Sequence, residues 1–176
     1  MNFTFKHDMT FNELIALVIT SEGGYSSNPA DKGGPTKFGV AWNFNTDWLK
    51  LNLGYKVGTD LKKLTLDQAK QCYYERYWLP SHSNGISDLD LAYIHLDTAI
   101  NLGIGGASTM LGKLSKNPKF YDGSKGKNRV LFMGLFLEYV AIRLSFYTHA
   151  RDRADFLDGW VNRIVFVINK SLEIGE

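Results

Sequence analysis

The spacing of apolar residues predicts a chain built mostly of helices. The first helical face begins after Thr10, and Thr10 with Glu13 has the spacing of a capping box. Gly23 and Gly24 predict the end of this helix, because glycine adopts backbone angles that other residues resist. The pattern therefore places Glu22 in the last turn. The apolar residues on this face are Phe11, Leu14, Ile15, Val18 and Ile19.

Residues 25–59 break the helical pattern with many turn-forming residues, and we expect irregular structure there with a small hairpin around residues 37–40. Thr65 and Gln68 then predict a capped helix that runs to Tyr77 and is stopped by Pro80. Further helices are expected at 88–102, ending at Gly103, and at 107–114. After a polar loop at 117–127, two long helices are expected at 128–149 and from 151 onward. The apolar positions of the last are Leu157, Trp160, Val161, Ile164, Val165 and Ile168.

These elements predict a mainly α fold, a helical bundle with a small irregular or β-hairpin element in the N-terminal third. Arg143 and Arg163 lie in apolar helices, where we expect them to pair with Glu138 or Asp158. Trp160 and Phe156 have helical spacing and are expected in the core rather than at a sugar site.

Composition narrows the classes of function. The 176 residues are 44% hydrophobic and 22% charged, which argues against disorder, and the net charge of +2 is too small to indicate nucleic-acid binding. The most apolar stretch, 130–147, is interrupted by charges, so we expect a core helix and no membrane insertion. Residues 1–8 lack the features of a secretory signal, so we expect synthesis in the cytoplasm, and a substrate outside the cytoplasmic membrane would require delivery by another component.

Cysteine and histidine give no sign of a metal or redox site. The single cysteine, Cys72, is expected to be a small buried hydrophobe. The four histidines show no metal-ligand spacing, so no metal and no cofactor are expected.

The residues that carry candidate chemistry lie between positions 22 and 39. Glycoside hydrolysis needs one protonated carboxyl and one ionised carboxyl. Glu22 follows an apolar helix face, and burial there would raise its pKa, whereas Asp31 lies in a polar glycine-rich loop and would stay ionised. Thr36 is a candidate to hold the attacking water. On spacing alone, however, Glu22 fits a solvated surface residue as well, Asp31 an Asx turn and Thr36 an ordinary turn hydroxyl.

The run from Glu22-Gly23-Gly24-Tyr25 through Asp31-Lys32-Gly33-Gly34-Pro35-Thr36-Lys37-Phe38-Gly39-Val40 resembles the hallmark of the glycoside hydrolase family 108 N-acetylmuramidases. Some members carry the older label of secretion activator proteins. The resemblance implies a lysozyme-like fold and Glu22 as the catalytic acid. Phage-type lysozymes of the same superfamily have an Asp nine positions after the Glu, as Asp31 is here, and a Thr shortly after, one residue beyond the place of Thr36.

The second half of the chain also resembles this family, in Asp97, Asn101, Gly103 and Gly105 and in the closing helices. The resemblance implies a catalytic region at 1–90 and, at 91–176, a helical region similar to a peptidoglycan-binding domain, the two packed as one compact unit. The substrate would be peptidoglycan, cleaved between N-acetylmuramic acid and N-acetylglucosamine in the periplasm or cell wall, with a holin or secretion machinery giving access. A lytic transglycosylase and a non-catalytic wall-binding or secretion-accessory protein are the alternatives.

Aromatic residues outside the helical cores are the candidates for sugar contact, because flat rings stack on the apolar faces of pyranoses. Tyr25 ranks first, since it adjoins the catalytic motif, and Trp42 and Trp78 follow. Asn101 lies on a helix that we expect to line the cleft, where it would hydrogen-bond the N-acetyl group of the substrate.

Overall fold

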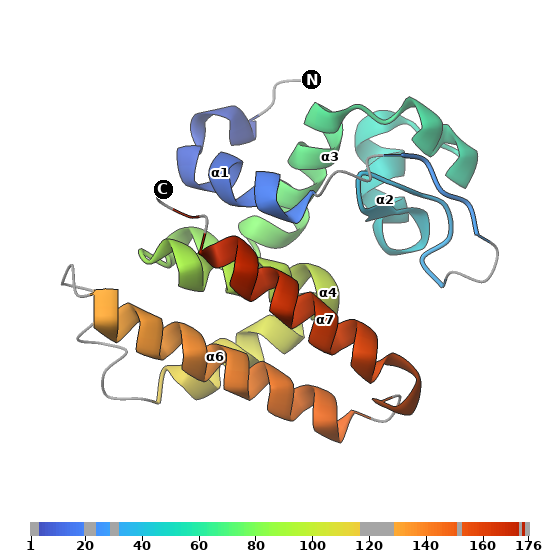
Figure 1. Cartoon of the computed structure of the whole chain (residues 1–176). Helices are drawn as coiled ribbons and strands as arrows, with labels where there is room; N and C mark the ends of the chain where they lie inside the picture. Colours follow the sequence, from blue (N-terminus) through green and yellow to red (C-terminus); the bar gives the residue numbers. More distant parts are fainter. Residues whose placement is uncertain are drawn as a thin grey trace. The chain divides into compact units, whose positions relative to one another are not determined.

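The computed structural model describes residues 4–19, 24–28, 32–116, 129–150, 153–172 and 174, and the mainly α prediction with one small hairpin is confirmed (Figure 1). Contacts divide the chain into two compact units, Met1–Arg76 and Tyr77–Glu176, each of which is described by itself. The division predicted at position 90 separates a catalytic from a wall-binding region. That division concerns what the two regions do rather than how they pack, and it stays a prediction.

The first unit opens with a short 3-10 helix, Thr4–His7, and helix α1, Met9–Val18. The N-cap is Asp8, whose carboxylate accepts the Phe11 N–H at 2.9 Å, so the predicted capping box at Thr10 and Glu13 is wrong. The helix ends at Val18, because Ile19 has a ψ of 73° that no helix continues. The prediction that α1 extends to Glu22 is therefore also wrong. The predicted apolar face is confirmed at Phe11, Leu14, Ile15 and Val18, which are buried, whereas Ile19 lies beyond the end of the helix and is only partly buried.

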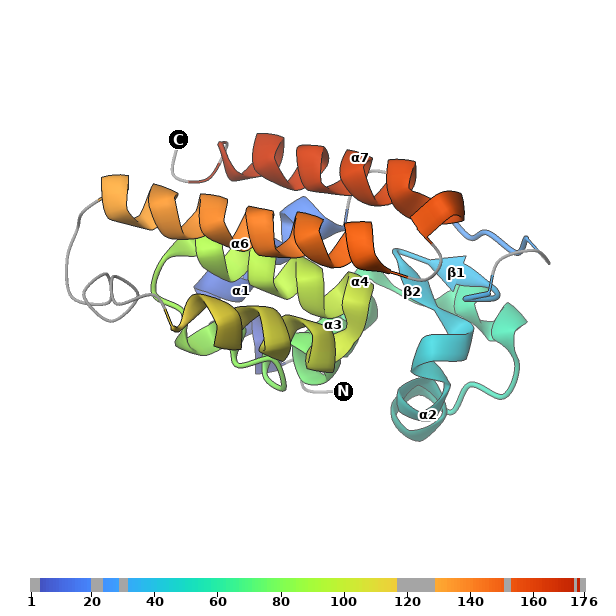
Figure 2. The ribbon, with the colours of Figure 1, turned by 90° about the horizontal axis from the view of Figure 1, so that it is seen from below.

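Two strands form the predicted hairpin, β1 at Thr36–Lys37 and β2 at Val40–Ala41, antiparallel and joined by the turn Phe38-Gly39 (Figure 2). Val40 is 1% exposed and fixes which face of the hairpin turns inward. An isolated bridge between Ser26 and Thr36 adds a further antiparallel contact on the other side of β1.

Helix α2, Trp42–Leu53, lies in the segment that the pattern predicted to be irregular, and that prediction is wrong. Only Asn45, Trp48 and Leu49 of this helix are buried, and two of its apolar residues, Phe44 and Leu51, are exposed. So few buried apolar positions leave little periodicity in the sequence to detect. The helix ends at Gly54, which has the left-handed φ of 66° that suits glycine.

A 3-10 helix, η2 at Gly58–Lys63, leads into helix α3, Leu66–Tyr73. The predicted capping box is confirmed: the Gln68 N–H donates to the Thr65 hydroxyl at 3.2 Å, and the Thr65 N–H donates to the Gln68 side chain at 2.9 Å. A π-helix, Tyr74–Trp78, follows, and a short 3-10 helix spans Ser83–Gly85. Cys72 is fully buried, as predicted.

Three long helices make up most of the second unit: α4 at Leu89–Leu114, α6 at Arg129–His149 and α7 at Arg153–Ser171. Helices α6 and α7 run side by side in opposite directions, and both contact α4 (Figures 1 and 2). Gly103, at φ 78° and ψ 164°, kinks α4 where the sequence predicted one helix to end. Along α7, Ile164 and Val167 are buried but Val165 is 49% exposed, so the prediction that Val165 faces the core is wrong.

A buried ion cluster joins the three helices of this unit. Asp97 on α4 accepts Arg143 Nη1 of α6 at 2.7 Å and Arg163 Nη2 of α7 at 2.5 Å. Both arginines are ion-paired, as predicted, but Asp97 is the partner rather than Glu138 or Asp158. Burial is the largest single effect and by itself would lower the pKa of Arg143. The charges of Asp97 and Tyr147 and the hydrogen bonds to both together outweigh it, so the pKa is raised. Arg143 therefore stays protonated, and the ion pairs of Asp97 link α4 to α6 and α7.

An aromatic stack supports that cluster. Arg143 Nε donates to the Tyr147 hydroxyl at 2.7 Å, and the Tyr147 ring stacks on Trp160 with centroids 4.9 Å apart. Trp160 thus packs within the helical unit, as predicted, whereas the Phe156 side chain lies outside the described part. No helix among the described residues is long and apolar enough to cross a membrane.

Candidate active site

Of the three predicted catalytic residues, the structure places Thr36. Glu22 and Asp31 lie outside the described residues, so their roles stay predictions. What the structure does describe is the framework on both sides of them: α1 before Glu22, and the segment from Lys32 into the hairpin after Asp31.

The segment that follows Asp31 is held by the first turn of α2. The Asn43 side-chain amide donates to the Lys32 carbonyl at 2.9 Å, and the Asn43 N–H donates to the Gly33 carbonyl at 3.0 Å. Gly34 has a φ of 68°, and a Cβ there would come within 3.0 Å of the Asn43 side chain. The Trp42 N–H donates to the Pro35 carbonyl at 2.8 Å. These bonds fix the course of the backbone at residues 32–35.

The turn of the hairpin is fixed by Tyr73 of α3. Its hydroxyl donates to the Phe38 carbonyl at 3.2 Å, and its ring is buried. Phe38 and Gly39 have φ values of 51° and 75°, in the left-handed region. A Cβ on Gly39 would collide with the Tyr73 hydroxyl, so this position takes glycine for two separate reasons.

Thr36 lies on β1, where it pairs with Ala41 of β2 on one side and with Ser26 on the other. Its N–H donates to Ser26 and its carbonyl accepts from Ser26, both at 2.8 Å. Its hydroxyl donates to the Gly34 carbonyl at 3.1 Å. Because a hydroxyl has one hydrogen to give, the Thr36 hydroxyl in this arrangement can bind a further partner only by accepting a hydrogen bond from it.

The four predicted sugar contacts lie in different settings. Tyr25 and Trp42 are partly exposed, next to the bridge at Ser26 and at the start of α2 respectively. Asn101 is exposed on α4, and its amide donates to the Asp97 carbonyl at 2.8 Å. Trp78 is 1% exposed and has no open face on which a sugar could stack, so its choice as a sugar contact is wrong.

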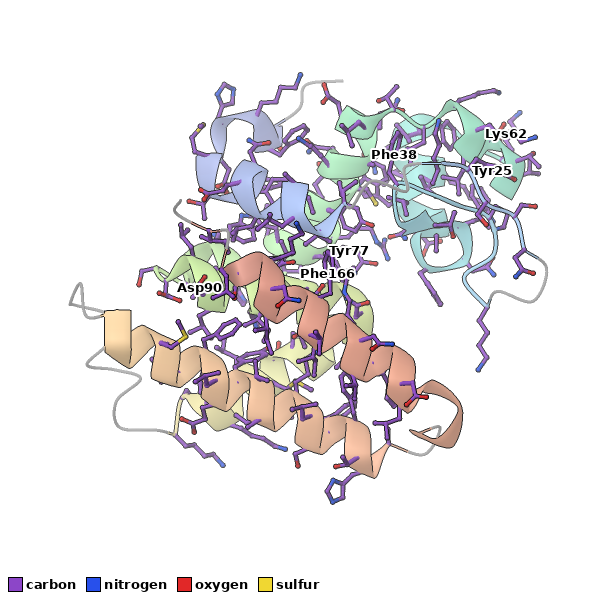
Figure 3. The ribbon with its side chains drawn as sticks, viewed as in Figure 1. Tyr25, Phe38, Lys62, Tyr77, Asp90 and Phe166 are labelled. Carbon is purple, nitrogen blue, oxygen red and sulfur yellow. The ribbon has the colours of Figure 1, made fainter. Side chains whose placement is uncertain are left out.

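Lys62, which no pattern in the sequence singles out, lies beside Tyr25. The ammonium of Lys62 lies over the Tyr25 ring, 5.2 Å from its centroid (Figure 3). The two residues are far apart in the chain, so no local spacing pairs them. No sequence pattern singles out Asn43 or Tyr73 either. Asn43 lies on the helix that the pattern did not reveal, and Tyr73 reads from the sequence as an ordinary core residue.

The described part of the chain contains neither a candidate metal site nor a reactive thiol. No group of three His, Cys, Asp or Glu side chains within that part could hold a metal ion. Burial raises the pKa of the Cys72 thiol to about 12, which keeps it protonated and unreactive.

The chain is similar to a known protein family and to a solved structure. The family model described as glycosyl hydrolase 108 matches residues 15–103, just over half of the chain, a range that holds the whole motif and the hairpin. The solved structure of SagA from Brucella abortus is similar to this chain, with a TM-score of 0.74 and 25% identity, over 96% of this chain and 97% of that one. Among curated proteins, none matches. The predicted resemblance and the mainly α, lysozyme-like fold are confirmed.

Proposed function

The chain belongs to glycosyl hydrolase family 108, and on that premise we propose that it is a lysozyme-type N-acetylmuramidase. The family indicates a glycosidase that degrades peptidoglycan. The proposal adds the bond, the β-1,4 linkage between N-acetylmuramic acid and N-acetylglucosamine, and the acid, Glu22.

In this mechanism Glu22 protonates the leaving oxygen while Asp31 activates a water or stabilises the developing cation. The observation that carries the proposal is the fixed backbone from Lys32 to Thr36, bonded to the first turn of α2 on one side and to Ser26 on the other. Catalysis requires side chains held in a fixed geometry, and the chain has a fixed course directly after the position of Asp31. Thr36, at the end of the segment, orients the water.

Tyr25 and Trp42 are the proposed stacking surfaces for the glycan, because both rings are partly exposed and lie next to this fixed segment. Asn101 is proposed to bind the N-acetyl group of a sugar. We place the protein's action in the periplasm or cell wall, with a holin or secretion machinery giving access.

Product analysis tests the proposed reaction. Purified peptidoglycan is digested with the protein, and the soluble fragments are analysed by mass spectrometry after borohydride reduction. Hydrolysis by a muramidase leaves reducible N-acetylmuramic acid ends. Anhydro ends identify a lytic transglycosylase instead. Reducible N-acetylglucosamine ends contradict the bond assignment, and tight wall binding without release of reducing sugar contradicts catalysis.

A further inference from the structure

A cation held over an aromatic ring marks one surface of the first unit. The Lys62 ammonium lies 5.2 Å from the centre of the Tyr25 ring, the distance of a cation–π contact (Figure 3). Tyr25 belongs to the motif segment and Lys62 to the 3-10 helix η2. The two elements are held in place independently of this contact: Pro35 packs against Gly58 of η2, and Ser26 pairs with Thr36.

A second lysine, Lys37 of the hairpin, is bonded to the backbone of η2 at Lys62. Lys37 Nζ donates to the Lys62 carbonyl at 2.8 Å and lies 5.2 Å from the Phe38 ring centroid. The bond to a backbone carbonyl uses one of its three hydrogens, so donors remain for a ligand. The Lys37 ammonium is thus held at the Lys62 carbonyl, and the Lys62 ammonium is held at the Tyr25 ring.

The neighbouring carboxylate does not neutralise these two lysines. Asp60 on η2 accepts the N–H groups of Lys56 and Val57, at 2.8 and 3.2 Å, and the ammonium of Lys63 at 3.3 Å. Those backbone N–H groups, first that of Lys56, hold the pKa of Asp60 below its usual range. Within the described residues, neither Lys37 nor Lys62 forms an ion pair with a carboxylate.

We propose that Tyr25, Lys62 and Lys37 form a subsite that binds a carboxylate of the substrate, so that the enzyme distinguishes muramic-acid-containing glycan from neutral glycan. This subsite proposal rests on the proposed function, and it says that the sugar bound beside Tyr25 is the N-acetylmuramic acid. The carboxylate is either the free lactyl group of N-acetylmuramic acid or a carboxylate of the peptide that this group carries. The ring holds the ammonium in place before the ligand arrives, which reduces the entropy lost on binding.

The test compares Lys62→Gln with Lys63→Gln, a neighbour whose loss removes the same charge from the same helix but whose ammonium pairs with Asp60. Both side chains are exposed, so both variants should fold. Binding is measured by calorimetry with the Glu22→Gln protein as background, so that no ligand is cleaved. The ligands are glycan strands with peptides, peptide-free strands with free lactyl groups, and neutral chitooligosaccharides of equal length.

We expect Lys62→Gln to weaken binding of the anionic strands about fivefold, the upper range for an exposed charge pair, and to flatten its dependence on salt. Lys62→Arg should restore most of it. The lactyl carboxyl is amidated wherever a peptide is attached. Loss confined to peptide-bearing strands therefore assigns the peptide carboxylate, loss confined to peptide-free strands assigns the free lactyl group, and loss with both shows that the subsite accepts either carboxylate. If Lys62→Gln and Lys63→Gln weaken binding equally, or if neutral ligands lose as much as anionic ones, the subsite is refuted. A wild-type protein that cleaves nothing yet shows the Lys62 effect refutes the muramidase proposal and leaves the subsite standing.

Discussion

Replacement of Asp97 by Asn tests how the second unit is held together. The amide keeps the size of the carboxylate and removes its charge. Arg143, which is fully buried, is then a cation without an opposite charge, while Arg163 is 28% exposed and reaches water. Breaking one side of a buried ion pair costs about 3–5 kcal/mol. For a chain of this length, that loss corresponds to a fall in melting temperature of roughly 6–20 °C.

Guanidinium unfolding followed by circular dichroism measures the free energy. Asp67→Asn is the matched control, because it breaks the half-exposed pair of Lys6 with Asp67, worth about 0.2–1 kcal/mol. The double replacement Asp97→Leu with Arg143→Leu should lose less stability than Asp97→Asn, since no buried charge is left unpaired. If Asp97→Asn costs no more than Asp67→Asn, the buried cluster does not stabilise the unit and the reasoning fails.

Three further predictions concern the first unit. Gly39→Ala should lower the free energy of unfolding by about 1–3 kcal/mol in chemical denaturation, and by more than Gly54→Ala does. Both glycines have left-handed φ angles, but of the two only Gly39 would bring the added Cβ against a side chain, that of Tyr73. Equal losses in the two variants would contradict this reasoning. Thr65→Ala should cost about 0.5–2 kcal/mol by the same measurement through loss of the α3 cap, and an unchanged midpoint would contradict that role. Cys72, with its pKa raised from 9.0 to about 12, should resist iodoacetamide at pH 8.5 until the protein unfolds. Its contribution to stability is full below pH 9 and is lost as the pH rises towards 12, a slope that Cys72→Ala should remove.

The elements that the sequence predicted well are those with local signals. The capping box at Thr65 and Gln68, the break at Gly103 and the hairpin near Gly39 each depend on residues a few positions apart. The start of α1 was misplaced by two residues because Asp8 and Thr10 are both good caps, and only the structure shows which one the backbone uses. Helix α2 escaped detection because it buries few apolar side chains.

Pairings over long sequence distances account for the rest. Asp97 lies 46 residues from Arg143 and 66 from Arg163, and no periodicity links an ion pair across three helices. Local charge spacing instead pointed to Glu138 and Asp158, on the arginines' own helices. The candidate site divides in the same way. Its motif could be recognised because it is contiguous, whereas Lys62 reaches Tyr25 only through the fold.

Activity of the Glu22→Gln variant tests the central claim most directly. The amide has nearly the shape of the carboxyl but cannot donate a proton to the leaving oxygen. We expect the variant to match the wild type in circular dichroism and melting temperature, yet to release no reducing sugar from purified peptidoglycan. A folded Glu22→Gln protein that digests walls at the wild-type rate would contradict the account.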